Sequence, residues 1–248
     1  MHTYKLIIAY DGTNYAGWQV QKNSSTIQEA IQKNLAILFD EKISLVGSSR
    51  TDAGVHALGQ VAHFRTEKEK DPHKILRALN GMLPLDIRIL DVTLEANTFH
   101  AQRSAKRKVY HYKICNSQSV LPFDRLYITH VPYRLNYHLM EESCKKFVGK
   151  HNFCSFANEC LLGAAKRNPF KTIYRLDLVK TTNGAVFEFE GDGFLYKMVR
   201  NIVGTIIEVG RGKIPLDSID DIFAAQDRKK APKAAPAKGL FLVSVIYK

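Results

Sequence analysis

Hydrophobic and polar residues in the first hundred positions follow two periodicities, which predict helices and strands in a particular order. Apolar side chains at helical spacing, preceded by a capping box of Thr26 and Glu29, predict a helix over residues 26–40. Pro72 is typical of a helix start and opens a second helix that runs to about Leu83. Strands are expected at the runs rich in β-forming residues: Tyr4 to Tyr10, Ile43 to Val46, Gln60 to Arg65 and Ile87 to Leu94.

The second half of the chain repeats this order of elements. Its expected strands are Lys108 to Ile114, Thr172 to Val179, Ala185 to Glu190 and Leu240 to Tyr247. Its expected helices are Tyr137 to Val148, Leu195 to Val209 and a shorter one at 217–225. Asn183-Gly184 suits a tight hairpin between the two middle strands. Each half therefore reads β-α-β-β-α-β, which is the order of the ferredoxin-like split unit.

Two such units in tandem predict an α+β fold with helices on one face of a mixed or antiparallel sheet and a central cleft where the halves join. We expect one domain over residues 1–105 and a second over 106–248. The halves differ in one connection, because residues 47–59 form a long loop where the second half has a short hairpin. Long loops on a rigid scaffold often carry function.

Composition excludes several classes of protein. Hydrophobic residues make up 45% and charged residues 24%, which is ordinary for a globular protein and argues against disorder. No apolar run is long enough to span a bilayer, and the first residues lack the features of a secretory signal. We therefore expect a cytoplasmic protein, with Cys115, Cys144, Cys154 and Cys160 as reduced thiols.

The net charge of +12 is distributed unevenly along the chain. Residues 1–105 hold 12 basic and 11 acidic side chains, whereas residues 106–248 hold 24 basic and 13 acidic ones. Phosphates attract such an excess of Lys and Arg, so nucleic acid is the first partner to consider. A solvated basic surface that aids solubility explains the charge equally well.

The long loop holds the side chains best suited to chemistry. Asp52 lies among small residues that let a ligand approach closely, and Arg50 can hold its carboxylate ionised. An ionised, positioned carboxylate acts as a nucleophile, a base or a metal ligand. An Asp that closes an Asx-turn fits the same residues. His56 and His63 add a metal-binding alternative, although their spacing from Asp52 matches no familiar metal motif.

Three features of the second half fit contact with RNA. Tyr110 and Tyr112 face the same side of an expected strand behind a basic stretch, where they either stack on bases or fill the core. Arg200 lies in an apolar helix and either needs a buried partner such as Asp52 or points to solvent. The segment from Asp227 to Lys238 reads as a mobile basic loop that can contact phosphate.

Together these stretches resemble the TruA family of tRNA pseudouridine synthases. The string Arg-Thr-Asp-Ala-Gly-Val-His-Ala at residues 50–57 is the most specific match. The other matches run in order from end to end: Tyr10 to Thr13, Gly17 to Gln19, Gly59 to Val61, His63-Phe64, Phe99 to Ala101, Tyr110 to Tyr112, Phe153, Ser155-Phe156, Gly193 to Leu195, Val203-Gly204, Gly239-Leu240 and Val243.

The resemblance implies a pseudouridine synthase fold, and an activity: isomerisation of uridine to pseudouridine at positions 38, 39 and 40 in the anticodon stem-loop of tRNA. By the family pattern Asp52 is the nucleophile and Tyr110 contacts the target base, while Arg50 and Arg200 line the site. A homodimer that binds tRNA is implied as well. The reaction gains no atoms and loses no electrons, so we expect no cofactor and no metal.

The sequence departs from the family pattern at a few positions. Ser49 stands where many members have Gly, and it would be strained if that position needs a positive φ. Gln102-Arg103 and Lys197 also differ from the commoner residues. A non-catalytic RNA-binding module, or a metal-dependent RNA hydrolase built on Asp52, His56 and His63, remains as an alternative from the residues.

Overall fold

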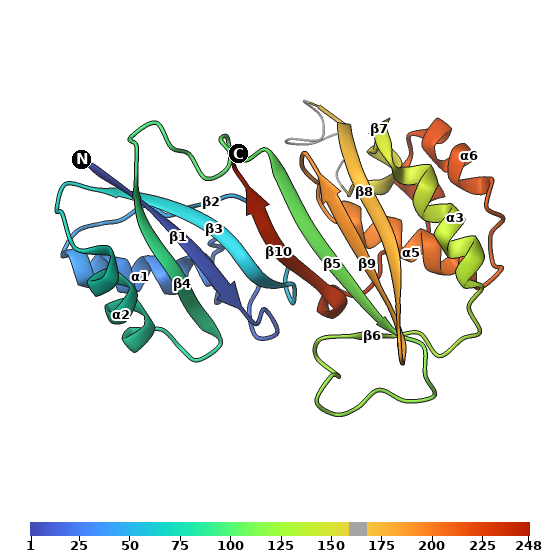
Figure 1. Ribbon diagram of the computed structural model, residues 1–248, viewed down its shortest axis with the longest axis horizontal. Helices are drawn as coiled ribbons and strands as arrows, with labels where there is room; N and C mark the ends of the chain where they lie inside the picture. The colour runs from blue at the N-terminus through green and yellow to red at the C-terminus, as the bar shows by residue number, and fades with distance from the viewer. Residues whose placement is uncertain (159–167) are drawn as a thin grey trace. The chain divides into compact units, whose positions relative to one another are not determined.

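The computed structural model describes residues 1–158 and 168–248, and the chain folds into two compact units, Met1–Lys106 with Phe241–Lys248, and Arg107–Leu240 (Figure 1). Both units contain helices and antiparallel strands, so the predicted α+β class is confirmed. Within the described residues, no helix has the length and apolar character needed to cross a membrane.

The first unit follows the predicted order of elements. They are β1 (His2–Tyr10), α1 (Ile27–Phe39), β2 (Val46–Gly47), β3 (His56–Thr66), α2 (Pro72–Met82) and β4 (Ile87–Glu95). β1 lies between β4 and β3 and is antiparallel to both, and β2 pairs with the far side of β3. This β4-β1-β3-β2 order is that of a ferredoxin-like sheet.

Both helices of the first unit begin where the sequence predicts. The Thr26 side chain accepts a hydrogen bond from the backbone N–H of Glu29, so it caps α1. Asp71 accepts from the backbone N–H of His73, and Pro72 takes the first position of α2. These bonds satisfy backbone donors that a helix start otherwise leaves without a partner.

The core of the first unit follows from the alternation along β1. Tyr4, Leu6 and Ile8 point to the same face of the strand and are fully buried. The Tyr4 ring stacks on Phe64 of β3 at 5.2 Å, and Phe39 of α1 packs edge-on against Phe64. Burial of a large apolar side chain contributes roughly 1.5–3 kcal/mol, so these contacts hold α1 against the sheet.

The second unit is built around an antiparallel sheet. Its strands are β5 (Arg107–Cys115), β6 (Thr129–His130), β7 (Gly149–Asn152), β8 (Phe170–Thr181) and β9 (Gly184–Gly191). Its helices are α3 (Tyr137–Phe147), α5 (Met198–Gly210) and α6 (Ser218–Ala225), with 3-10 turns η1 (Cys154–Phe156), η2 (Arg228–Lys230) and η3 (Ala237–Gly239). Four of the strands pair antiparallel in the order β5-β9-β8-β7, and the short β6 pairs in parallel with β5. The predicted hairpin between β8 and β9 is confirmed, because Thr181 pairs with Gly184.

The helices of the second unit enclose a cluster of phenylalanines. Phe147 of α3, Phe156 of η1 and Phe223 of α6 lie with ring centroids 4.8–5.5 Å apart. Phe187 and Phe189 of β9 are also fully buried. The apolar spacing of the expected helices therefore corresponds to one shared core.

The last strand differs from its predicted place. β10 (Leu240–Ile246) pairs in parallel with β3 through Phe241 opposite His56, and residues Phe241–Lys248 belong to the first unit. The backbone N–H of Lys106 donates to the carbonyl of Ile246, and Tyr247 donates to the carbonyl of Ala101. These contacts hold the end of the chain in the unit that carries the long loop.

Three local expectations were wrong. Of the expected strand at Ile43 to Val46, only Val46 pairs in a sheet, as the first residue of β2. Side chains of α1 bind the carbonyls before it: Gln28 binds that of Leu45 and Gln32 that of Ile43. The helix expected from Leu195 begins at Met198, after a left-handed Lys197. Cys154 is in a disulfide and not reduced, whereas Cys115 and Cys144 are free. Cys160 lies outside the described residues.

Candidate active site

The start of the Asp52 loop is held by one buried glutamine. Gln60 of β3 has no exposed surface, and its amide nitrogen donates to the carbonyl of Ser49 at 2.9 Å. Its amide oxygen accepts from the backbone N–H of Ser49 at 3.3 Å. The glutamine side chain thus pairs with Ser49 as a neighbouring strand would, and fixes the backbone just before Arg50.

The middle of the loop is fixed by the segment that follows β1. The backbone N–H of Trp18 donates to the carbonyl of Thr51 at 3.0 Å, and the hydroxyls of Tyr10 and Thr51 lie 2.8 Å apart. Gly17 has a φ of +96°, and a Cβ there would lie 2.5 Å from the carbonyl oxygen of Thr51. Only glycine therefore allows this close approach.

The end of the loop is fixed at the first residue of β3. His56 is buried, its Nδ1 accepts from the backbone N–H of Gly12 at 3.1 Å, and it lies 3.1 Å from a carboxylate oxygen of Asp11. Its ring stacks on Phe241 with centroids 4.7 Å apart. A Cβ on Gly12 would lie 2.0 Å from the carbonyl oxygen of Val55, so the two segments are in direct contact.

Asp52 lies between these anchors. Its backbone carbonyl accepts from the N–H of Val55, so the residue begins a tight turn, and its side chain is half-buried. Arg50 is exposed. The loop therefore holds a carboxylate on a constrained backbone and leaves part of it open to a ligand, which is the preorganisation that covalent catalysis requires.

Ser49 carries no backbone strain. The non-glycine residues with positive φ among the described positions are Asn23, Asp40, Lys197 and Gln226. Ser49 is not one of them, so its backbone is one that any L-residue adopts. The departure from Gly at this position therefore leaves the loop geometry intact.

In the second unit, the two tyrosines of β5 are both buried but have different surroundings. Tyr112 is fully buried, its hydroxyl donates to the carbonyl of Pro236 at 2.8 Å, and it lies 2.7 Å from the hydroxyl of Thr129. Tyr110 retains 7% of its surface, and its ring meets the edge of Phe194 at 5.1 Å. Tyr112 is therefore a core residue, and Tyr110 is the tyrosine nearer the surface.

Arg200 lies in the first turn of α5 and is half-buried. Its Nε donates to the carbonyl of Ala235 at 2.8 Å, and the backbone N–H of Ala235 donates back to the carbonyl of Arg200 at 2.9 Å. The interpretation of Arg200 as a purely solvent-facing charge is wrong, because these two hydrogen bonds hold its backbone and its guanidinium against the segment that follows η2.

The residues of the metal alternative have other contacts. His56 contacts Asp11 and Gly12, as described above, while His63 accepts at Nδ1 from the backbone N–H of Ala101 at 3.2 Å. Across residues 1–158 and 168–248, no group of three or more His, Cys, Asp or Glu side chains is arranged to hold a metal ion.

Comparison with known proteins places this geometry in a family. Residues 6–116 and 143–248 match the family described as tRNA pseudouridine synthase. The chain belongs to the tRNA pseudouridine synthase family. Its members catalyse an isomerisation, so a non-catalytic RNA-binding module gains no support.

Named relatives of this tRNA pseudouridine synthase family match the chain along its full length. The "tRNA pseudouridine synthase A 1" of Protochlamydia amoebophila is 52% identical over 248 residues, which is all of this chain and 97% of the relative. The "tRNA pseudouridine synthase A" of Acetivibrio thermocellus is 46% identical, and that of Thermoanaerobacter sp. (strain X514) 42%, each over the whole of both chains.

Sequence reasoning missed several residues that shape the site of this family member. Gln60 and Asp11 lie in stretches that match the family, but neither of them was assigned a role, and the signal for both was their place in those stretches. Lys108 precedes Tyr110 by two positions on the same face of β5. Burial, with Lys171 nearby, lowers the pKa of Lys108 to about 8.

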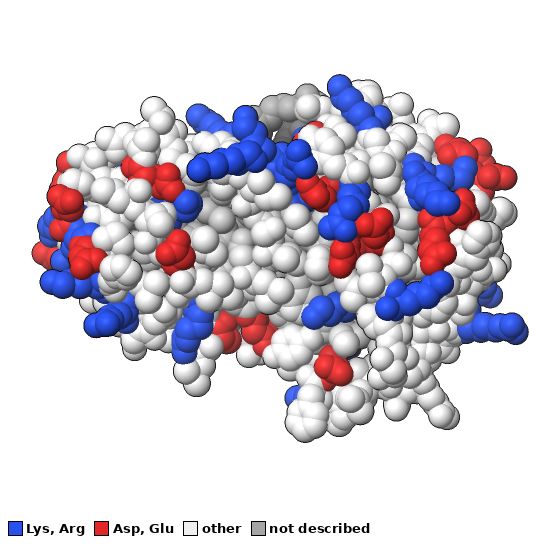
Figure 2. All heavy atoms as spheres, in the orientation of Figure 1, with Lys and Arg blue, Asp and Glu red and all other residues white. Residues whose placement is uncertain are grey.

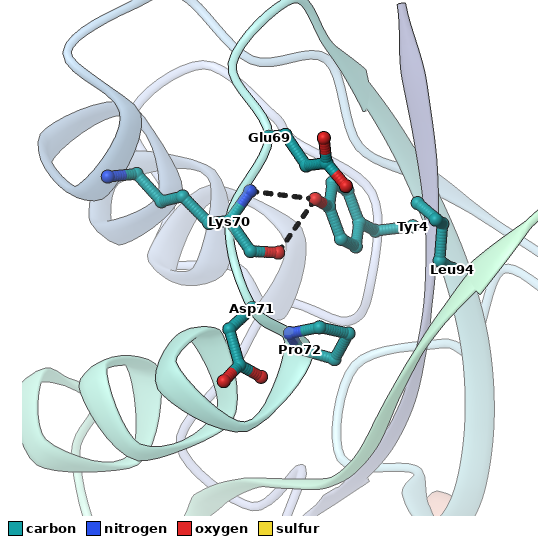
Figure 3. A pocket seen from close by; sticks show the side chains of 6 residues that line it. All are labelled: Tyr4, Glu69, Lys70, Asp71, Pro72 and Leu94. Atoms are coloured by element: carbon teal, nitrogen blue, oxygen red, sulfur yellow. Dashed lines mark hydrogen bonds between the residues drawn. The ribbon is translucent and has the colours of Figure 1, made fainter.

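A hollow in the first unit is separate from these residues. It is lined by Tyr4, Glu69, Lys70, Asp71, Pro72 and Leu94 (Figure 3). The Tyr4 hydroxyl donates to the carbonyl of Lys70 and accepts from its N–H, so the polar groups at the base of this hollow already bind each other. None of the predicted site residues lines it.

Proposed function

We propose that the chain isomerises uridine to pseudouridine at positions 38, 39 and 40 in the anticodon stem-loop of tRNA, with Asp52 as the nucleophile. The observation that carries the proposal is the Asp52 turn, anchored on both sides in a chain whose family is that of tRNA pseudouridine synthases. A half-buried carboxylate on a backbone held in this way suits attack on a nucleoside.

The chemistry needs a carboxylate and little else. The N1–C1′ glycosidic bond breaks, the uracil turns over, and a C5–C1′ bond forms while C5 loses its proton and N1 takes one up. The sugar carbon is electron-poor as the bond breaks, so an anionic partner stabilises it, as in retaining glycosidases. Attack by Asp52 at C1′, attack at C6 of the uracil, and assistance of elimination to a glycal all use the same carboxylate. No atoms are gained and no electrons leave, so the proposal includes no cofactor.

Three further residues complete the proposed site. Arg50 neutralises negative charge near the substrate. Tyr110 stacks on the target base, and its hydroxyl assists removal of the C5 proton. Arg200 supplies a second cation next to the base or its phosphate.

The two halves of the sequence take different parts in the proposal. The half at 1–105 carries the catalytic loop, and the more basic half at 106–248 binds the tRNA backbone. The face drawn in Figure 2 has interspersed basic and acidic side chains. Ion pairs account for some of them in the second unit, where Arg175 pairs with Asp177 and Glu188. Lys229, Lys230 and Lys233 are exposed and form no ion pair with described residues. We assign phosphate contacts to these three lysines.

The proposal extends to the setting in which the enzyme works. Extraction of the target base from its stack costs a few kcal/mol, which phosphate contacts offset. We propose a cytoplasmic homodimer that binds tRNA, as the resemblance implies.

One incubation separates the proposal from its alternatives. Unmodified tRNA is incubated with the protein, and both pseudouridine and cut ends are mapped along the product. The proposal expects pseudouridine at positions 38, 39 or 40 and intact strands. Binding without pseudouridine would indicate an RNA-binding module, and cleavage that a chelator inhibits would indicate a metal-dependent hydrolase.

The role of Tyr110 is tested by removal of its hydroxyl alone. If the hydroxyl takes part in proton transfer, Tyr110→Phe should slow pseudouridine formation by about 10²-fold or more while tRNA affinity stays within about twofold. Tyr174→Phe on β8, whose side chain is 48% exposed, is the matched control and should leave both unchanged. A fully active Tyr110→Phe would restrict Tyr110 to stacking.

A further inference from the structure

Arg228 lies in the basic segment that the sequence indicated as a mobile loop, yet its guanidinium binds protein atoms. Its Nε donates to Oδ1 of Asn158 at 3.3 Å, and one terminal nitrogen donates to the carbonyl of Ala231 at 2.7 Å. The other donates to Oδ1 of Asn201 and to the carbonyl of Pro232, both at 2.8 Å. Four of the five N–H donors of the guanidinium are therefore used inside the unit.

The two carbonyl acceptors begin the segment that lies along α5. Further on, Ala235 exchanges two hydrogen bonds with Arg200, and the carbonyl of Pro236 accepts from Tyr112. A Cβ on Gly204 would lie 2.1 Å from the carbonyl oxygen of Lys233, so the segment contacts the helix backbone directly. The segment from Ala231 to Pro236 is thus fixed at both ends and in its middle.

The two amide acceptors of Arg228 fix the start of α5. Asn201 follows Arg200 directly, is fully buried, and donates to the carbonyl of Phe156 at 2.7 Å and to Oδ1 of Asn158 at 3.1 Å. The N-cap of α5, Lys197, is left-handed and makes no capping bond with its side chain. The network of Arg228, Asn201 and Asn158 therefore holds a helix start that lacks a side-chain cap.

We infer that Arg228 is a positioning residue for Arg200. Arg228 holds the segment Ala231–Pro236 on one side and Asn201 on the other. Arg200 forms hydrogen bonds with Ala235 of that segment and precedes Asn201 in the chain. Lys cannot replace Arg228, because an ammonium offers three donors from one atom and not a planar fork. This inference rests on the proposed function, since that proposal places Arg200 in the active site.

A double-mutant cycle measures whether Arg228 acts through Arg200. Single-turnover pseudouridine formation on unmodified tRNA is measured for wild type, Arg228→Lys, Arg200→Ala and the double variant. Arg228→Lys should slow the step about tenfold or more, because small displacements of a positioned group are costly to catalysis. In the Arg200→Ala background the same change should cost less than about twofold, since no positioned guanidinium is left to lose.

A matched control and a second measurement make the outcome independent of folding. Arg211→Lys, at the C-cap of α5, keeps a cation beside Glu208 and the ring of Tyr133 and should stay within about twofold of wild type. Amide exchange at Ala235, whose N–H donates to Arg200, should speed up by about tenfold in Arg228→Lys and not in Arg211→Lys. If Arg228→Lys does not fold, Arg228→Gln takes its place in both measurements.

The outcomes separate this inference from the proposed function. Wild type that forms no pseudouridine contradicts the proposed function, while the exchange measurement still tests whether Arg228 holds the segment. If wild type is active, additive rate losses in the cycle, or unchanged exchange at Ala235, overturn the positioning role alone.

Discussion

The connection between the two middle strands differs between the units. In the first, residues 48–55 join β2 to β3 and carry Asp52, and hydrogen bonds from Trp18, Gln60 and the Gly12–His56 pair fix them. In the second, two exposed residues, Thr182 and Asn183, join β8 to β9. Extra loop length costs little entropy in itself. The loop therefore differs from the hairpin chiefly in the number of separate segments that form hydrogen bonds with it.

Substitution of Gly17, which packs against the Asp52 loop, should have the largest effect on the loop. Gly17 has a φ of +96°, and Gly17→Ala adds a Cβ 2.5 Å from the carbonyl oxygen of Thr51. We therefore expect the free energy of unfolding to fall by about 2–4 kcal/mol. Gly212→Ala is the matched control, because its φ is +68° but the added Cβ meets no atom within 4 Å. Urea unfolding of both variants measures the difference, and equal losses would contradict the close contact.

Acid should weaken the strand that follows the loop. Burial, with His100 and Arg65 nearby, lowers the pKa of His63 on β3 from 6.5 to about 4. The unfolded chain then binds more protons than the folded one between these values, so stability falls as the pH drops from 6.5 to 4, by up to roughly 3 kcal/mol.

Urea unfolding as a function of pH tests this effect. His63→Asn keeps an acceptor for the N–H of Ala101 but cannot titrate, so its stability should vary less between pH 6.5 and 4 than that of wild type. In the second unit, burial also lowers the pKa of His111, but Glu188 opposes the shift. An identical pH dependence in wild type and His63→Asn would refute the role of His63.

The smallest expected change in stability comes from paired substitutions that compare the loop with the hairpin. Gln60→Leu keeps the size of the side chain but leaves the backbone N–H and carbonyl of Ser49 without this partner, which should cost about 1–3 kcal/mol. Asn183→Ala in the hairpin should change stability by less than about 0.5 kcal/mol. Thermal unfolding distinguishes the two, and a Gln60→Leu variant as stable as wild type would show that the loop does not depend on this clamp.

Much of the fold could be predicted, because local signals and tertiary packing agree. The Thr26 cap, Pro72 and the alternation of Tyr4, Leu6 and Ile8 each predicted the element that forms. The expected strand before the loop failed, because Gln28 and Gln32 of α1 take the carbonyls of Leu45 and Ile43. Such long-range capping leaves no periodic signal in the sequence.

The candidate site could be predicted only in part. Asp52 was identifiable from its loop and from the family resemblance. The resemblance also singled out Tyr110, whereas strand spacing alone treats Tyr110 and Tyr112 alike and only their surroundings in the structure separate them. Arg228 reads in sequence as one more cation in a basic run. Its guanidinium points into the unit because it binds Asn158 and Asn201, which lie 70 and 27 positions away. Residue spacing in the sequence could not reveal these contacts.

The most direct test of the account replaces one oxygen of the proposed nucleophile. Release of tritium from C5-labelled uridine in tRNA is measured for Asp52→Asn, with Asp40→Asn, an exposed left-handed position, as the control. The account predicts a loss of at least about 10³-fold for Asp52→Asn, with tRNA affinity within about twofold, and full activity for the control. Tritium release at the wild-type rate by Asp52→Asn would contradict the assignment of Asp52 as the nucleophile.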